Sequence, residues 1–135
     1  MTIPPEDQQL IHAARAAQQH AYAPYSGYPV GAAVRTVEGR IFTGCNVENA
    51  SYGLSICAER AAVFSAIAAG ARAIVAVAVC TPDGGGTPCG ACRQVLTEFA
   101  PLSENCTVWI VKPDTVVAKH TLAELLPYRF RLETL

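Results

Sequence analysis

Charged residues are scarce in this chain of 135 residues: Asp, Glu, Lys and Arg make up only 16% of it, and the formal net charge is −1. It contains no run of Lys or Arg, which proteins that bind nucleic acid polymers normally carry. We therefore expect a small-molecule ligand rather than DNA or RNA. Globular proteins average about 25% charged residues. The shortage of charge, with a hydrophobic content of 51%, indicates that self-association covers part of the surface.

Long apolar runs are also missing. The longest apolar stretch, residues 61–80, is interrupted by Gly70 and Arg72, so we expect no membrane span. Residues 1–7 lack the basic region and apolar core of a signal peptide. These features predict a cytoplasmic protein whose six cysteines are free or bound to metal. The length predicts one domain, residues 1–135, and no internal repeat or long linker divides it.

Three of the cysteines lie in two short motifs, Cys57-Ala58-Glu59-Arg60 and Pro88-Cys89-Gly90-Ala91-Cys92-Arg93. The residues between the motifs are typical of a helix, a strand and a loop, which can return the chain to its starting point. Three thiols and one carboxylate then share one site. Three cysteines provide three ligands of a tetrahedral zinc and leave the fourth position for water, as in catalytic zinc sites. A carboxylate beside such a water can move its proton.

The positions of these residues near helix starts favour ionised thiols. Cys57 precedes a predicted helix, and Cys89 and Cys92 open another; the unpaired N–H groups and dipole of a helix N-terminus lower the pKa of thiols. Arg60 lies three residues after Cys57 and can offset the thiolate charge, with a surface ion pair as the alternative. For Glu59 the alternative is an ordinary acid in a helix first turn.

The Cys89–Cys92 pair is also compatible with roles other than catalysis. A Cys-x-x-Cys pair can be a redox pair or half of a four-ligand structural zinc site. A redox pair leaves the Cys57 motif without a role. A structural zinc needs a fourth protein ligand, and His12, His20 and His120 each lack a partner at ligand spacing. A structural-zinc or binding module without catalysis remains the alternative from another class.

The two motifs resemble those of the zinc-dependent nucleoside and nucleobase deaminases. Residues 29–33 (Pro-Val-Gly-Ala-Ala) and 46–52 (Asn-Val-Glu-Asn-Ala-Ser-Tyr) are similar to the small homotetrameric cytidine deaminases. The resemblance extends from about residue 10 to Phe130. It implies hydrolysis of free cytidine or deoxycytidine to uridine or deoxyuridine plus ammonia, with one Zn²⁺ per subunit and Glu59 carrying protons. A deaminase of modified nucleosides such as blasticidin S is the alternative enzyme.

The same resemblance implies a set of substrate-binding residues. Asn46 and Glu48 match positions that bind the ribose, and their amide and carboxylate suit sugar hydroxyls; a solvated turn is the alternative. Ala58 also matches a substrate-binding position. Phe130 matches an aromatic that stacks on the pyrimidine of a neighbouring subunit in a homotetramer; packing within its own subunit is the alternative. Tyr28 stands where the family usually has Phe, and an ordinary core aromatic is its alternative.

Apolar periodicity alternates between that of helices and that of strands. We expect helices over residues 6–20, 58–69, 90–100 and 121–126, and strands over residues 30–37, 40–47, 73–80, 107–112 and 116–119. The alternation predicts an α/β fold, a three-layer α/β/α sandwich. The family resemblance adds a five-stranded mixed sheet whose last strands are antiparallel. The run 73–80 is apolar throughout, as in a central strand, and the helix 58–69 has almost no polar face, which favours burial by other subunits.

Overall fold

The computed structural model describes residues 2–132 of the chain. Its helices are α1 (Pro5–Gln18), the short 3-10 helix η1 (Tyr52–Leu54), α2 (Ala58–Ala68), α3 (Gly90–Phe99) and α4 (Leu122–Leu125). Its strands are β1 (Gly31–Thr36), β2 (Ile41–Cys45), β3 (Ile74–Cys80), β4 (Thr107–Lys112) and β5 (Thr115–Thr121).

The strands form one five-stranded mixed sheet in the order β2-β1-β3-β4-β5. β1 pairs antiparallel with both β2 and β3, β3 pairs parallel with β4, and β4 pairs antiparallel with β5. The predicted mixed sheet with antiparallel last strands is therefore confirmed. The apolar run of β3 occupies the central position, as predicted, because a strand covered by helices on both faces has no polar side.

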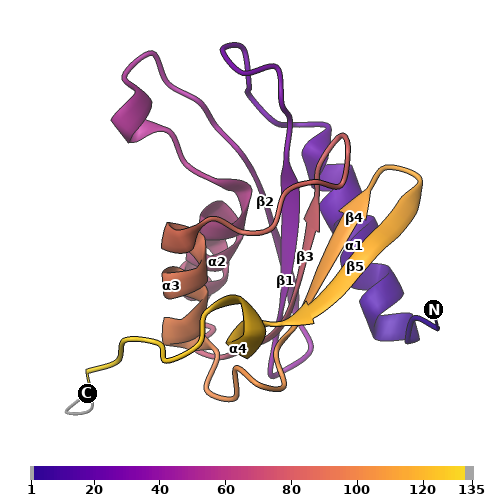
Figure 1. The fold of residues 1–135 in the computed structure, drawn as a ribbon, viewed down its shortest axis with the longest axis vertical. Helices are drawn as coiled ribbons and strands as arrows, with labels where there is room; N and C mark the ends of the chain where they lie inside the picture. Colours follow the sequence, from indigo (N-terminus) through magenta and orange to yellow (C-terminus); the bar gives the residue numbers. More distant parts are fainter. Residues whose placement is uncertain (1, 133–135) are drawn as a thin grey trace.

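Helices cover both faces of the sheet, which confirms the predicted three-layer arrangement (Figure 1). α1 lies on one face and contacts the first four strands, whereas α2, α3 and α4 lie on the other. The core accordingly divides into two clusters, with Trp109 and Leu10 between α1 and the sheet and Leu96 and Val63 on the opposite side. No helix among residues 2–132 is long and apolar enough to cross a membrane.

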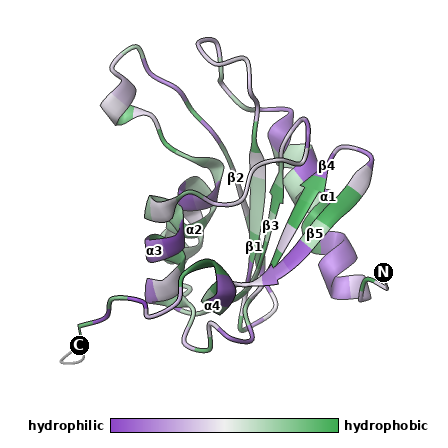
Figure 2. Cartoon of the chain, viewed as in Figure 1, coloured by the Kyte–Doolittle hydropathy of each residue, from purple (hydrophilic) through white to green (hydrophobic). Residues whose placement is uncertain are grey.

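Most element boundaries lie within one residue of the predicted ones, but α1, β2 and β5 each differ by two residues at one end, and β2 ends at Cys45 instead of residue 47. α1 starts at Pro5, because proline at the first helical position needs no N–H partner, and it ends at Gln18 in a short turn instead of continuing to residue 20. β5 is longer than predicted because its register with β4 pairs Lys112 with Thr115 and Thr107 with Thr121. Figure 2 shows that β3 and β4 consist mainly of hydrophobic residues, whereas α1 contains many hydrophilic ones.

Small residues let the helices approach the sheet closely. A Cβ atom on Gly31 would lie 2.7 Å from Gln18 Cα in α1, and one on Gly44 would lie 2.6 Å from the carbonyl oxygen of Ala58 in α2. Both contacts are with helix backbone, so no side-chain rotation can relieve them. The buried faces are correspondingly rich in alanine; these alanines are Ala32, Ala33, Ala58, Ala62, Ala66, Ala76 and Ala78.

We predict that Gly44→Ala destabilises the fold, because the added methyl group forces α2 away from β2. Overpacking of this kind costs about 1–3 kcal/mol, which thermal unfolding monitored by circular dichroism would show as a lower Tm. Gly53→Ala is the matched control, since a Cβ there meets nothing within 4 Å. Equal Tm values for the two variants would show that α2 does not pack against β2 as closely as described.

Candidate active site

The sheet topology brings the starts of two helices to the same edge. β2 and β3 run in the same direction, because each is antiparallel to β1, and α2 and α3 follow these two strands in the chain. Both helices therefore begin near the carboxyl ends of their strands, where α/β folds place their sites. Cys57 is the residue before α2, Cys89 is the residue before α3, and Cys92 lies in the first turn of α3.

The three thiols converge there. Cys57 Sγ lies 3.9 Å from Cys89 Sγ, and Cys89 Sγ lies 3.5 Å from Cys92 Sγ. A tetrahedral zinc with Zn–S bonds of about 2.3 Å separates its sulfur ligands by about 3.8 Å. All three sulfur atoms lie within 4.8 Å of one another, so the donor set and its spacing fit one metal ion. Among residues 2–132, this is the group of metal-ligating side chains with that spacing.

The electrostatics at Cys57 favour a thiolate. A hydrogen bond with the Cys92 thiol and the guanidinium of Arg60 lower the pKa of Cys57 to about 5. Arg60 Nη2 donates to Cys57 Sγ at 3.3 Å, so Arg60 lies beside the Cys57 thiolate, within reach of the thiol cluster as predicted. The hydrogen bond with Cys57, together with burial, raises the pKa of Cys92. Metal binding would remove the proton of the Cys92 thiol, because the thiolate is the form that binds a metal.

Glu59 lies in the first turn of α2 and is almost fully buried, with 5% of its surface exposed. Burial is the main effect that raises the pKa of its carboxyl group to about 7, and the neighbouring Cys57 thiolate acts in the same direction. A carboxyl group that titrates near neutrality can both accept and release a proton at physiological pH.

A cavity of about 430 Å³ opens above these groups, within the size range of small-molecule sites. It is lined by residues from both helix starts and from three loops. The predicted site residues among them are Tyr28, Asn46, Glu48, Cys57, Ala58, Glu59, Arg60 and Cys89. The cavity therefore brings together most of the predicted site residues, whereas Cys92 is fully buried and does not line it.

Asn46 and Glu48 also hold a neighbouring loop. Asn46 Oδ1 accepts from the backbone N–H of Val30 at 2.8 Å, and its Nδ2 donates to the carbonyl oxygen of Tyr28 at 3.0 Å. Glu48 Oε1 accepts from the N–H groups of Tyr25 and Ser26 at 2.9 and 3.1 Å. Glu48 Oε2 also accepts from the hydroxyl group of Ser26, and each of the two side chains keeps part of its hydrogen-bonding capacity for a ligand hydroxyl.

Phe130 does not line the cavity of its own chain. Its side chain is 66% exposed, and its carbonyl oxygen accepts from Gln94 Nε2 at 3.2 Å. Arg129 Nη1 donates to the carbonyl oxygen of Ala100 at 2.9 Å. These bonds hold the C-terminal segment along α3, with the aromatic ring directed to solvent.

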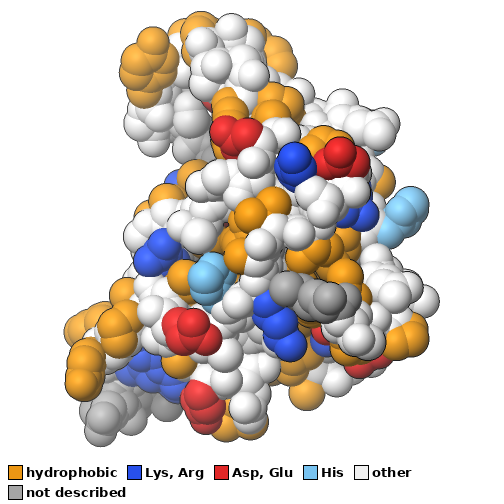
Figure 3. Space-filling view, turned by 45° about the vertical axis from the view of Figure 1, so that its right-hand side comes forward, with side chains coloured by type: hydrophobic (Ala, Val, Ile, Leu, Met, Phe, Trp, Pro, Cys, Tyr) orange, Lys and Arg blue, Asp and Glu red, His pale blue; other side chains and the backbone are white. Residues whose placement is uncertain are grey.

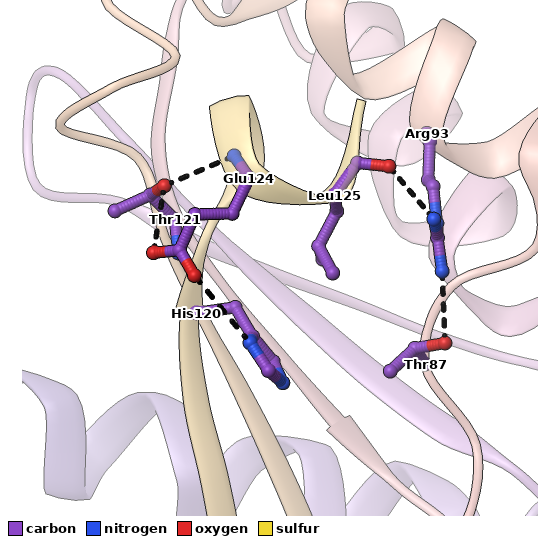
Figure 4. A network of polar contacts seen from close by, with 6 residues as sticks. All are labelled: Thr87, Arg93, His120, Thr121, Glu124 and Leu125. Atoms are coloured by element: carbon purple, nitrogen blue, oxygen red, sulfur yellow. Dashed lines mark hydrogen bonds and ion pairs between the residues drawn. The ribbon is translucent and has the colours of Figure 1, made fainter. Parts of the chain in front are cut away.

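Arg93 is a residue to which sequence analysis assigned no role. Its Nε donates to the carbonyl oxygen of Pro88 at 2.7 Å and its Nη2 to Thr87 Oγ1 at 3.0 Å, immediately before Cys89. Its Nη1 donates to the carbonyl oxygen of Leu125 in α4 at 2.7 Å (Figure 4). Arg93 thus fixes the turn that presents Cys89. Its place directly after Cys92 in the motif is the signal that could have identified it.

α4 is itself stabilised at its start, as Figure 4 shows. The backbone N–H of Glu124 donates to Thr121 Oγ1 at 3.1 Å, and the backbone N–H of Thr121 donates to Glu124 Oε1 at 3.2 Å. This reciprocal capping box satisfies two donors that a helix start leaves open. Arg93 is therefore bonded to a helix whose first turn is fixed by its own sequence.

Comparison with known proteins gives the family. The family model for the cytidine and deoxycytidylate deaminase zinc-binding region matches residues 4–107, which is most of the chain. The cytidine deaminase of Sporosarcina psychrophila is 43% identical over 129 residues, covering 95% of this chain and 93% of that protein. A probable cytidine deaminase of Dictyostelium discoideum is 45% identical over 132 residues, covering 96% and 87%.

Similar solved structures point to the same family. The crystal structure of cytidine deaminase from Burkholderia pseudomallei matches with a TM-score of 0.84 and 47% identity, covering 96% of this chain and all of that one. The Mycobacterium tuberculosis cytidine deaminase matches with a TM-score of 0.81 and 39% identity, covering 96% and 100%. The fold and the thiol cluster thus define a zinc-binding α/β protein. The chain belongs to the cytidine and deoxycytidylate deaminase family.

We predict that Cys89→Ala abolishes stoichiometric zinc binding, because two thiols and no third protein ligand cannot hold the ion tightly. Metal analysis of the purified protein by mass spectrometry is the measurement. Cys106→Ala is the control, since this buried thiol lies at the other end of the fold, before β4. One zinc per chain retained in Cys89→Ala would show that the ligand set is wrong.

Proposed function

We propose that residues 1–135 form a single cytidine deaminase domain that converts cytidine or deoxycytidine and water to uridine or deoxyuridine and ammonia. The observation that carries the proposal is the placement of Glu59, buried and with a pKa raised to about 7, beside three convergent thiols in one cavity. Relatives named cytidine deaminase over nearly the whole chain support it.

Cys57, Cys89 and Cys92 would hold the zinc ion, which would act as a Lewis acid and make water nucleophilic near neutral pH. Glu59 accepts the proton of the water that adds to C4 of the base and delivers it to N3. It then accepts the remaining proton from the hydroxyl group added at C4 and delivers it to the amino group, which leaves C4 as ammonia. One carboxylate thus serves successive transfers. Arg60 remains bonded to Cys57, where its charge offsets that of the thiolates. Ala58, at the start of α2, lines the cavity beside them.

The lining of the cavity favours a nucleoside over a nucleotide. Among the described lining residues Arg60 is the only cation, and it already donates to Cys57. The acidic side chains there are Glu48 and Glu59, and the carboxylate of Glu48, whose pKa is lowered by its hydrogen bonds with Ser26 and Tyr25, repels a phosphate. Asn46 and Glu48 keep hydrogen-bonding capacity for sugar hydroxyls. A neutral sugar is therefore the ligand that this end of the cavity accommodates.

We predict that the zinc-loaded protein deaminates cytidine and that Glu59→Ala loses at least about 10⁴-fold in kcat, since a positioned proton carrier contributes roughly 10²–10⁴ per step. The fall in ultraviolet absorbance on conversion of cytidine to uridine measures the rate. Glu59→Ala should keep its zinc, which separates loss of proton transfer from loss of the metal. Activity within tenfold of wild type in this variant would refute the role of Glu59.

A substrate panel distinguishes the alternatives. A deaminase of modified nucleosides turns over blasticidin S with a higher kcat/KM than cytidine, whereas we expect the reverse. We also expect cytosine and cytidine 5′-monophosphate to react poorly, because one lacks the sugar and the other carries a phosphate. A structural-zinc or binding module leaves every member of the panel unchanged.

We further propose that the protein is a cytoplasmic homotetramer. All six cysteines are free, as in a reducing compartment. Several large apolar side chains are exposed in the single chain: Tyr52, Leu54, Phe64 on α2, and Phe130. Figure 3 shows such side chains gathered on the projecting upper part of one face and at its lower edge. Contact with other subunits would bury them.

The proposed assembly brings Phe130 to the cavity of a neighbouring chain, where stacking on the base contributes about 1–3 kcal/mol. We predict that Glu59→Ala and Phe130→Ala chains, each impaired alone, regain activity when they are refolded together. Some sites then combine Glu59 of one chain with Phe130 of another. Light scattering checks the tetramer, and mass spectrometry checks subunit exchange. Activity equal to the parental average after confirmed exchange would mean that Phe130 is not shared.

A further inference from the structure

A side-chain hydrogen bond joins two loops at the cavity. The hydroxyl group of Tyr28, in the loop between α1 and β1, donates to Asp83 Oδ1 at 2.6 Å, in the loop between β3 and α3. Tyr28 lines the cavity, and so do Thr81, Gly86 and Thr87 of the second loop. The bond therefore connects one wall of the cavity with the segment that leads to Cys89.

Asp83 is a fixed acceptor although three glycines follow it. Its Oδ1 also accepts from the backbone N–H of Gly85 at 2.9 Å, and Thr81 Oγ1 accepts from the N–H of Gly84 at 2.9 Å. Gly84 has a φ of +70°, and a Cβ there would overlap Val117 of β5. The glycines thus allow a compact turn seated on the sheet, which holds the carboxylate in place.

The protonation states suit this bond. Hydrogen bonding by Tyr28 lowers the pKa of Asp83, so the carboxylate is ionised at neutral pH. Burial, with the proximity of Asp83, raises the pKa of Tyr28, so the phenol remains a donor. A neutral hydroxyl donating to an ionised carboxylate is a charge-assisted hydrogen bond, which is stronger than one between neutral groups.

The backbone of Tyr28 is held from the opposite side. Asn46 Nδ2 donates to its carbonyl oxygen at 3.0 Å, and its own N–H donates to Ser26 Oγ at 3.0 Å. With the hydroxyl bonded to Asp83, both ends of the residue are fixed and its ring is a rigid part of the wall. The hydroxyl proton is used by Asp83, so the residue offers its ring, rather than a donor, to a ligand.

We propose that Asp83 is a positioning residue that holds the ring of Tyr28 for nucleoside binding and thereby sets substrate affinity. The inference rests on the proposed function. Asp83 is not among the residues that line the cavity, whereas Glu59 and the thiols are placed for the chemistry. Loss of the bond leaves an aromatic side chain that must be ordered when the substrate binds, and this ordering weakens binding. The proton transfers of Glu59 do not depend on it.

The test is a double-mutant cycle with steady-state kinetics on cytidine. Asp83→Ala and Tyr28→Phe should each raise KM about three- to tenfold, with kcat within about twofold of wild type. The KM of the double variant should be no higher than that of either single variant, because the two substitutions remove the same hydrogen bond. Asp83→Asn keeps an oxygen acceptor and should recover most of the affinity. Glu38→Gln, in the exposed turn at the far end of β1, is the charge-matched control and should behave as wild type.

Each other outcome has a defined meaning. A wild-type KM in Asp83→Ala, KM effects that multiply in the double variant, or a loss confined to kcat would overturn the inference. The inference would also be overturned if Asp83→Asn had a KM as high as that of Asp83→Ala. That result would show that substrate affinity depends on the negative charge of Asp83 and not on its oxygen acceptor. If Asp83→Ala lost its zinc, the comparison of Tyr28→Phe with wild type would decide. A wild-type protein that leaves cytidine unchanged would overturn the proposed function as well. If the wild-type protein is active and the variants have the same KM, only this inference is overturned.

Discussion

Three thiols from two helices have to meet at one point, and the rest of the fold is arranged so that they do. β2 and β3 share a direction only because β1 lies between them antiparallel to both. The helices that follow can then start side by side, Gly44 lets α2 lie close to its strand, and Arg93 holds the turn before Cys89. Sulfur positions within a few tenths of an ångström of tetrahedral spacing require all of these contacts together.

The same small volume has to stabilise opposite protonation states. Cys57 is pushed toward the ionised form by hydrogen bonding and by Arg60, whereas burial pushes Glu59 toward the neutral form. The two pKa values move in opposite directions because the Cys57 thiol contacts a guanidinium group, whereas the Glu59 carboxyl group is buried away from water. Pairs of groups whose pKa values are driven apart in this way typically divide acid, base and ligand roles in an enzyme site. Here one helix start provides both environments within three consecutive residues.

Sequence analysis could predict the order and type of the elements, because apolar runs and periodicity report burial directly, and it could select the thiols, because their motifs are local. It assigned no role to Asp83 or Arg93. Their hydrogen-bond partners lie 55 and 32 positions away in the chain, and such distant contacts produce no periodic pattern in the sequence. Asn46 and Glu48 show a related difficulty. Amides and carboxylates bind sugar hydroxyls and backbone groups equally well, so composition alone did not reveal that both side chains also hold a protein loop.

The alanine-rich faces of the sheet and of α2 determine how the interior responds to substitutions. Alanine has no side-chain rotamers to lose, so its burial costs only backbone conformational entropy. For the same reason it has no alternative rotamers into which it can move. A methyl group removed from a neighbour therefore leaves an empty volume that adjacent alanines cannot fill. The interior around the cavity therefore has little configurational plasticity, and it acts as a stiff support for the loops that line the cavity.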